Sequence, residues 1–240
     1  MPYTFRSRVR YSECGEDGLQ SLFSIMNYMQ DCSTFQSEAL GLGTKRMQEL
    51  HRAWLLSAWH VAADRYPAFG EEIEVGTFAC GFQSFYGFRR FFIRDAKGAF
   101  CVRADSIWFL YDTEHEMPVK SDEALMLPYL NAEQGTDFDM LHLGKMSRKL
   151  PAPRNGVPGE PFAVPRHFLD SNLHMNNARY LDLACEAAEV FRPKEWRASY
   201  VHAAKLGDVL IPCVEKREHE RIVGLNKEDG SLSAVVSFVV

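Results

Sequence analysis

At 240 residues the chain is long enough for one large domain or two small ones, and a composition of 46% hydrophobic and 25% charged residues allows a substantial core. A formal net charge of −5 argues against broad nucleic-acid binding, which needs a strongly basic face. The apolar stretches Ala53–Trp59 and Ala234–Val240 are far shorter than the roughly 18 residues of a membrane-spanning helix. Residues 1–6 lack the pattern of an export signal, so we expect a cytoplasmic protein without a membrane span.

The cysteines and histidines give no sign of a metal site or another cofactor. Six cysteines are scattered without a C-x-x-C pair, which predicts reduced thiols rather than a disulfide framework. Eight histidines include no H-E-x-x-H and no Cys/His cluster. We therefore expect a protein that works without a cofactor.

The first half of the chain predicts a strand, a loop and an amphipathic helix. Residues 3–11 alternate as a short strand, residues 12–18 form a loop, and Gly41 or Gly43 would end the segment that follows. Between them, apolar side chains recur at helical spacing: Leu19, Leu22, Phe23, Met26 and either Tyr28 or Met29.

The second half repeats this order. Residues 162–168 predict a strand and residues 169–173 a loop. An apolar helical stripe follows: Tyr180, Leu183, Ala184, Ala187, Ala188 and Phe191.

After each helix the pattern changes to strands. A Gly-acid pair opens a strand in each half, at Gly70–Glu71 and Gly207–Asp208. Each half then has a hairpin: residues 91–94 with 100–102, and 222–225 with 233–236. Residues 52–66 could form a helix or a strand; their counterpart, residues 199–206, favours a strand, so the repeat favours a strand for both.

A helix wrapped by an antiparallel sheet, present twice, is an α+β fold of the tandem (double) hotdog type. Burial of one sheet face against the helix would stabilise each module by about 25 cal/mol per Å² of apolar surface. A proline-containing stretch divides the chain into an N-terminal module, residues 1–116, a linker, residues 117–160, and a C-terminal module, residues 161–240.

The segment with the clearest chemical potential is D-x-N-x-H, immediately before the second helix. It places a carboxylate, an amide and an imidazole at Asp170, Asn172 and His174. In an extended stretch these alternate side chains would share one side, beside a helix N-terminus whose N–H groups can hold an oxyanion. Thioester hydrolysis needs such a combination of a base or nucleophile and carbonyl polarisation.

Helix capping offers a plainer explanation, because Asp and Asn are preferred caps and turn residues. The corresponding loop of the first half carries Cys14, Glu16 and Gly18, although it also precedes a helix. Capping therefore does not require the three groups, and the difference between the halves predicts one working site.

The chain resembles the acyl-ACP thioesterase family over nearly its whole length. The resemblance is carried by V-R-Y-S-E-C before the first helix, R-Y-P-x-x-G-E-E at Arg65–Glu72 and, most specifically, D-x-N-x-H-x-N-N-x-R-Y at Asp170–Tyr180. It implies hydrolysis of fatty acyl chains from acyl carrier protein (ACP), with catalytic roles for the Asp, Asn and His of the last motif. We expect Asp170 to act as general base or nucleophile, with Asn172 and His174 assisting.

One departure from the family pattern concerns a Y-x-x-E-C segment that carries a catalytic Glu in plant members. Here Tyr200 is followed by Ala203 and Ala204 in place of Glu and Cys, which argues against a cysteine nucleophile and means that the role of the Glu is missing or supplied otherwise. We expect nearby His202 to be a solvent-facing strand residue. Backbone N–H groups near Met175 and Asn176 are the predicted oxyanion donors.

An acyl chain needs an apolar pocket, and the first half is rich in large side chains that could line one or simply fill the core. They are Met26, Met29, Phe82, Phe85, Tyr86, Phe88, Phe91, Phe92, Trp108 and Phe109. Because ACP is acidic, docking needs local positive charge. The candidates are Lys145, Arg148, Lys149 and Arg154 in the linker, or Arg166 and Arg179 near the site.

Two alternative functions remain open from the sequence. An acyl-CoA thioesterase of the same fold would act on the same bond, and a non-catalytic acyl-chain or carrier-protein binding module would be compatible with the missing Glu. Since one chain already contains two modules, we expect a monomer or a homodimer.

Overall fold

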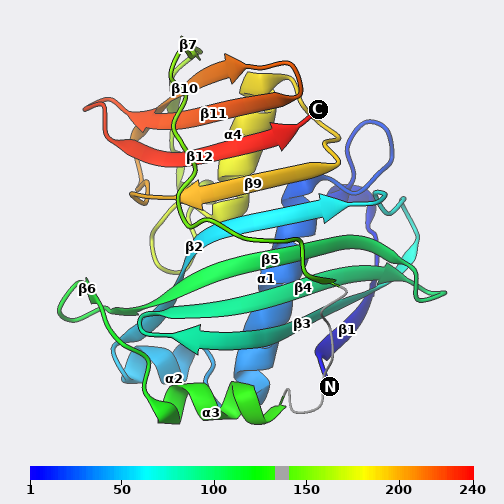
Figure 1. Cartoon of the computed structure of the whole chain (residues 1–240), viewed down its shortest axis with the longest axis vertical. Helices are drawn as coiled ribbons and strands as arrows, with labels where there is room; N and C mark the ends of the chain where they lie inside the picture. The colour runs from blue at the N-terminus through cyan, green and yellow to red at the C-terminus, as the bar shows by residue number, and fades with distance from the viewer. Residues whose placement is uncertain (133–140) are drawn as a thin grey trace.

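The computed structural model describes residues 1–132 and 141–240, and its two halves have the same construction (Figure 1). The first half contains β1 (Tyr3–Arg8), α1 (Leu22–Ala39), α2 (Thr44–Glu49), β2 (Arg52–Ala63), β3 (Glu72–Gln83), β4 (Tyr86–Asp95) and β5 (Phe100–Asp112). Then come β6 (Met117–Pro118), α3 (Glu123–Ala132), β7 (Val157–Pro158) and β8 (Phe162–Ala163). The second half contains α4 (Asn177–Ala188), β9 (Glu195–Tyr200), β10 (Val209–Lys216), β11 (Glu220–Lys227) and β12 (Leu232–Val239).

The two half-sheets are joined into one antiparallel sheet. Its order is β1-β3-β4-β5-β2-β9-β12-β11-β10-β7, with β6 added to β5 and β8 to β10. The halves meet where β2 pairs with β9, from Ala58 opposite Ser199 to Ala62 opposite Glu195. The helices α1 and α4 lie on the same face of this sheet and contact each other, as Figure 1 shows.

The sequence of α1 explains where the helix begins and which side it buries. Ser21 caps it, because its side-chain oxygen accepts the backbone N–H of Ser24 at 3.2 Å. Of the predicted apolar stripe, Leu22, Met26 and Met29 are buried, whereas Leu19 and Phe23 are half-buried. Gly41, whose φ is +73°, follows the end of the helix and confirms the expected glycine stop.

The strand prediction for residues 52–66 is confirmed by β2, and both predicted hairpins are present as β4–β5 and β11–β12. The predicted strand at residues 199–206 is wrong beyond Tyr200. The backbone turns away there because it serves another element: the carbonyl of Ala204 accepts the N–H of Met175 at 2.8 Å.

The predicted strand at residues 162–168 is also largely wrong, since only β8 is extended and paired. Pro165 follows, and a 3-10 helix at Arg166–Phe168 leads into the next loop. Proline has no N–H to donate to a neighbouring strand, which explains why the pairing stops before it.

Residues 141–158 run along the sheet face that α1 and α4 leave open (Figure 1). The Leu143 N–H donates to the Asp105 carboxylate at 3.0 Å, and the Leu150 N–H donates to Ser199 Oγ at 3.3 Å. Before this crossing, α3 packs near α2 at the lower end of the first half. The segment therefore covers both halves of the sheet rather than spanning open solvent.

No helix in the described part of the chain combines the length and the apolar character needed to cross a bilayer.

A buried histidine lies at the seam between the halves. His60 on β2 is 2% exposed, and its Nε2 lies 2.9 Å from Glu195 Oε1 on β9. Burial and the nearby Arg197 guanidinium hold the pKa of His60 below its ordinary value of 6.5, although Glu195 acts in the opposite direction. The neutral imidazole is therefore the form that the folded protein prefers.

This arrangement predicts an acid-sensitive seam. The unfolded chain binds a proton at His60 more readily than the folded chain. The contribution of the neutral His60 to the free energy of unfolding is therefore fully present above pH 6.5 and is lost as the pH falls through the lowered pKa of the folded state. We expect the free energy of unfolding to fall more between pH 7 and pH 5 in the wild type than in His60→Gln. Urea unfolding at each pH measures this, and parallel pH profiles for the two proteins would contradict it.

Candidate active site

The D-x-N-x-H segment forms a tight loop that is closed by backbone hydrogen bonds. The Asp170 N–H donates to the His174 carbonyl at 2.8 Å, and the Leu173 N–H donates to the Asp170 carbonyl at 3.1 Å. Leu173 has a φ of +60°, in the left-handed region that an L-residue adopts at a cost of about 1–2 kcal/mol. The expected extended conformation is wrong, because the chain reverses direction here instead of alternating its side chains.

The carboxylate of Asp170 organises this loop from within. Its Oδ1 accepts the backbone N–H of Asn172 at 2.8 Å and that of His174 at 3.3 Å. Among the described residues, no side-chain hydrogen bond joins the three predicted groups to one another. The loop thus brings the residues together through the backbone, with Asp170 and His174 half-buried and Asn172 exposed.

The predicted oxyanion donors are wrong. The Met175 N–H donates to the Ala204 carbonyl at 2.8 Å, and the Asn176 N–H donates to the Phe168 carbonyl at 2.8 Å. Asn176 also caps α4 by accepting the Ala178 N–H at 2.8 Å. These N–H groups position the loop against its neighbours, so they are not available for a thioester oxygen.

The first half contains the same loop in another sequence. The Gly15 N–H donates to the Leu19 carbonyl at 2.9 Å, and the Gly18 N–H donates to the Gly15 carbonyl at 3.0 Å. This pattern aligns Gly15, Asp17 and Leu19 with the three predicted catalytic residues. The expected counterparts Cys14, Glu16 and Gly18 are therefore one residue out of register.

The imidazole and the amide are nevertheless missing from the first loop, as predicted. The carboxylate of this loop, Asp17, has a structural role instead. Asp17 forms an ion pair with Arg192, with 2.7 Å between Arg192 Nε and Asp17 Oδ2. The guanidinium lowers the pKa of Asp17 by its hydrogen bond. Since Arg192 follows α4, the ion pair with Asp17 lets the first loop hold the two halves together. The second loop instead carries the carboxylate, the amide and the imidazole of the D-x-N-x-H motif.

A cavity of about 260 Å³ lies between α1, α2, α3 and the first half of the sheet. Asp170, Ser171 and Asn172 border it from the second half, whereas His174 is not among its lining residues. The loop that carries two of the predicted groups therefore faces the interior of the other module.

Only part of the predicted aromatic pocket is confirmed. Phe82, Phe88 and Trp108 line the cavity. The others belong to the core or to other surfaces: Met26, Met29, Phe85, Tyr86, Phe91, Phe92 and Phe109. Large aromatic residues on a buried sheet face fill the core as readily as they line a pocket, so their number alone does not locate one.

The cavity also has a polar wall that the sequence reasoning missed. Four residues of α1 line it: Gln30, Ser33, Thr34 and Ser37. Their spacing i, i+3, i+4, i+7 places them on one helical face, and this signal is already visible in the sequence.

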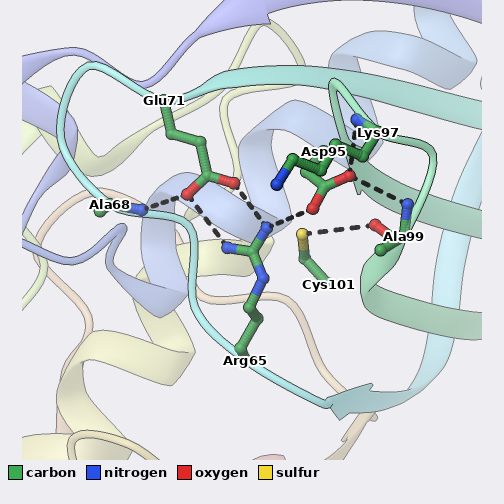
Figure 2. Close-up of polar contacts among 7 residues, drawn as sticks. All are labelled: Arg65, Ala68, Glu71, Asp95, Lys97, Ala99 and Cys101. Carbon is green, nitrogen blue, oxygen red and sulfur yellow. Dashed lines mark hydrogen bonds and ion pairs between the residues drawn. The ribbon is translucent and has the colours of Figure 1, made fainter.

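The R-Y-P-x-x-G-E-E segment has a structural role just after the C-terminal end of β2, whereas the cavity lies at the start of that strand (Figure 2). Arg65 Nη2 lies 2.6 Å from the Glu71 carboxylate and 3.0 Å from that of Asp95, which joins the end of β2 to the β4–β5 turn. Glu71 also accepts the Ala68 N–H at 3.0 Å. The bond from Arg65 holds the pKa of Glu71 below its ordinary value. None of the side chains in Figure 2 borders the cavity.

The position of the family Glu is occupied by the exposed Ala203, whose carbonyl accepts a hydrogen bond from Lys227 Nζ at 3.0 Å. His202 is exposed as expected but lies in a loop rather than a strand, with Nδ1 3.0 Å from the Leu232 carbonyl oxygen. Tyr200 donates to the Asn177 carbonyl at 3.0 Å, so this segment anchors the start of α4.

The basic residues near the site differ in accessibility. Arg166 is exposed and directly precedes the loop. Arg179 is packed between two rings, with its Cζ 3.9 Å from the centroid of Phe23 and 4.5 Å from that of Phe168, and it bonds Asp182 at 3.0 Å. Arg179 therefore links α1 and α4, and Arg166 is the better placed of the two to meet a partner.

Comparison with known proteins agrees with this architecture. The family described as "Acyl-ACP thioesterase N-terminal domain" matches residues 2–129. Dodecanoyl-acyl-carrier-protein hydrolase of Cinnamomum camphora is 28% identical over 191 residues, covering 74% of this chain and 48% of the relative. Oleoyl-acyl carrier protein thioesterase of Coriandrum sativum is 25% identical, covering 93% and 61%. The chain thus spans about half the length of the first of these relatives.

Two solved structures share the whole fold. An acyl-ACP thioesterase from Bacteroides thetaiotaomicron has a TM-score of 0.84 at 21% identity, covering 98% of this chain and 96% of its own. The 12:0-ACP thioesterase from Umbellularia californica has a TM-score of 0.82 at 19% identity, covering 99% and 96%. The predicted α+β double hotdog fold is confirmed, and the chain belongs to the acyl-ACP thioesterase family.

Proposed function

We propose that the chain hydrolyses fatty acyl-ACP thioesters to free fatty acid and holo-ACP, with Asp170, Asn172 and His174 as its catalytic residues. The observation that carries the proposal is the position of Asp170 and Asn172 at the border of a cavity formed by the other module. An acyl chain in this cavity would have its thioester beside the loop. The family relationship supports ACP as the carrier.

Asp170 is the group best placed to activate water. Its Oδ1 holds the loop through the N–H groups of Asn172 and His174, so Oδ2 is the oxygen left for a water molecule. As general base, Asp170 would take a proton while the water oxygen bonds to the carbonyl carbon. The carbon–sulfur bond then breaks, and the proton passes to the leaving thiolate. Direct attack by the carboxylate is the alternative first step.

Asn172 and His174 would support the same reaction. The exposed Asn172 amide is an N–H donor able to hold the water or the thioester oxygen at the cavity border. His174 lies at the end of the loop, away from the lining, where it would assist proton transfer as the substrate enters.

A non-catalytic acyl-binding module is the second candidate, and one observation favours it. Ala203 provides no carboxylate where the family pattern has a Glu. An acyl-CoA thioesterase is a third candidate, because CoA presents the same thioester. Cytoplasmic location and a monomeric or dimeric state stay predictions.

The catalytic role of Asp170 predicts a large loss in Asp170→Asn. The amide oxygen of Asn can still accept the loop N–H groups, so we expect a folded protein whose kcat falls by roughly 10² to 10⁴, as removal of a general base does. Asn172→Ala and His174→Ala should lower kcat by smaller factors. Release of free fatty acid from acyl-ACP, together with thermal unfolding, measures both effects.

Asp17→Asn is the control, because it makes the same chemical change in the equivalent loop of the first half, at the position that aligns with Asn172. It removes a charge from the ion pair with Arg192, so we expect a lower melting temperature with kcat retained. Unchanged kcat in folded Asp170→Asn would refute its role. Absence of hydrolysis in the wild type with both acyl-ACP and acyl-CoA would favour the binding module.

Carrier recognition through Arg166 gives a separate prediction. We expect kcat/KM for acyl-ACP to exceed that for acyl-CoA and to fall with rising salt, since screening weakens the attraction of an acidic carrier. Arg166→Glu should reduce kcat/KM for acyl-ACP but leave that for an uncharged acyl-pantetheine thioester nearly unchanged. Lys149→Glu serves as the comparison in the linker. A loss in Lys149→Glu alone would place docking there instead.

A further inference from the structure

The polar wall of the cavity is formed by the C-terminal part of α1. Ser33 and Ser37 line the cavity together with Gln30 and Thr34. The N-terminal part of the same helix buries apolar side chains, so the change in character occurs within one continuous element. Part of the opposite wall is apolar, with Trp54 and Phe82 among its residues. The cavity is therefore amphipathic and not a plain hydrocarbon channel.

The hydroxyl groups of this wall have their protons directed to the helix backbone. Ser33 Oγ donates to the Gln30 carbonyl at 2.8 Å, and Thr34 Oγ1 donates to the same carbonyl at 3.0 Å. Ser37 Oγ donates to the Ser33 carbonyl at 2.9 Å. A hydroxyl that donates in this way keeps its oxygen lone pairs as acceptors. The wall thus presents acceptors to whatever occupies the cavity.

Tyr129 of α3 extends this acceptor surface. Its hydroxyl lies 2.8 Å from Ser37 Oγ. Since Ser37 uses its own proton on the backbone, Tyr129 is the donor of this bond and its phenolic oxygen keeps lone pairs. Tyr129 is 2% exposed, so this bond lies inside the protein.

A guanidinium group lies beside the same wall. Arg89 of β4 lines the cavity, its Nη1 donates to Gln36 and to Thr77 Oγ1, and its Cζ lies 5.3 Å from the Tyr129 ring centroid. The guanidinium N–H groups are donors, so a hydroxyl on the occupant, which both donates and accepts, suits the hydroxyl oxygens and this group together.

The polar wall lies at a distance from the proposed reaction centre. Arg89 is opposite Ser106 on β5, Ser106 is opposite Trp59 on β2, and Trp59 is opposite Ala198 on β9. Three strand spacings of 4.7–4.9 Å separate Arg89 from β9 by about 14 Å. The segment after β9 anchors the proposed catalytic loop, so Arg89 lies three strands away from that anchor in the sheet.

We infer that the preferred acyl group carries a hydroxyl in the distal half of its chain, which donates its proton to one of the oxygens of Ser33, Thr34, Ser37 and Tyr129. This inference rests on the proposed thioesterase function and names its substrate class. An unsubstituted chain leaves the remaining lone pairs of these oxygens without a donor, whereas a hydroxyl adds a hydrogen bond. A keto group offers only an acceptor, so it gains nothing from the four hydroxyl oxygens and can use only donors such as Arg89.

The test uses ACP loaded with medium-length acyl chains, each prepared unsubstituted, with a hydroxyl and with a keto group at the penultimate carbon. At the best chain length we expect kcat/KM for the hydroxyacyl substrate to be roughly tenfold above the other two, the gain of one to two neutral hydrogen bonds. Equal or faster hydrolysis of the unsubstituted chains at every length would overturn the inference.

Substitutions in the polar wall test whether its hydroxyl groups cause the preference for a hydroxyacyl substrate. Ser37→Ala and Thr34→Val should each lower the ratio of kcat/KM for hydroxyacyl over unsubstituted substrate by roughly fivefold. Ser7→Ala is the matched control, because it also removes a serine bonded to a tyrosine, at 2.9 Å from Tyr28, but outside the cavity. A ratio that stays unchanged in both wall variants, or that falls equally in Ser7→Ala, would overturn the assignment.

Binding of the free acids separates this inference from the proposed function. Dissociation constants for hydroxylated and unsubstituted acids of equal length are measured on the wild type and on Asp170→Asn. If no thioester is hydrolysed, the proposed function fails, whereas tighter binding of the hydroxy acid still supports the inference. Equal binding of the two acids overturns the inference even if hydrolysis occurs.

Discussion

The pairing of β2 with β9 is the constraint on which the rest of this structure depends. Five residue pairs, from Ala58–Ser199 to Ala62–Glu195, join two half-sheets into one and place α1 beside α4. β2 and β9 run antiparallel across this seam, and the loop before α4 borders the cavity of the first half. The proposed catalytic loop and the cavity therefore come from different modules, and neither half holds both.

The two copies of the loop before the helix show how a duplicated element can take separate tasks. Both close with the same backbone hydrogen bonds, and both place a left-handed residue at the same point, Gly18 in one copy and Leu173 in the other. In the first copy Asp17 is bound to Arg192 and helps to fix the halves. In the second copy Asp170 forms no ion pair with a described residue, and Asp170 and Asn172 border the cavity. The equivalent loops thus contribute differently, one to the contact between the halves and the other to the border of the cavity.

The sequence predicted the fold well because the repeated order of elements and the periodicity of α1 and α4 are local signals. Strand ends were less predictable: Tyr200 ends β9 because the next residues receive the N–H of Met175, a contact between segments distant in the chain. The N–H groups of Met175 and Asn176 were wrongly predicted as oxyanion donors for the same reason, because their hydrogen-bond partners are set by tertiary contacts. The D-x-N-x-H residues were found from their spacing, whereas their geometry depends on a left-handed Leu173 that no pattern indicated.

The two ends of the sheet limit how the molecule can associate with itself. At one end β10 is covered by the two-residue strands β7 and β8, and Pro158 and Pro212 interrupt its hydrogen-bonding potential. At the other end β1 presents the exposed charged side chains Arg6 and Arg8. Short, proline-containing and charged borders discourage the addition of foreign strands, which is the usual route to fibrillar aggregation. A stable contact between two copies of the chain would therefore use the faces of the molecule and would not add strands to the edges of the sheet.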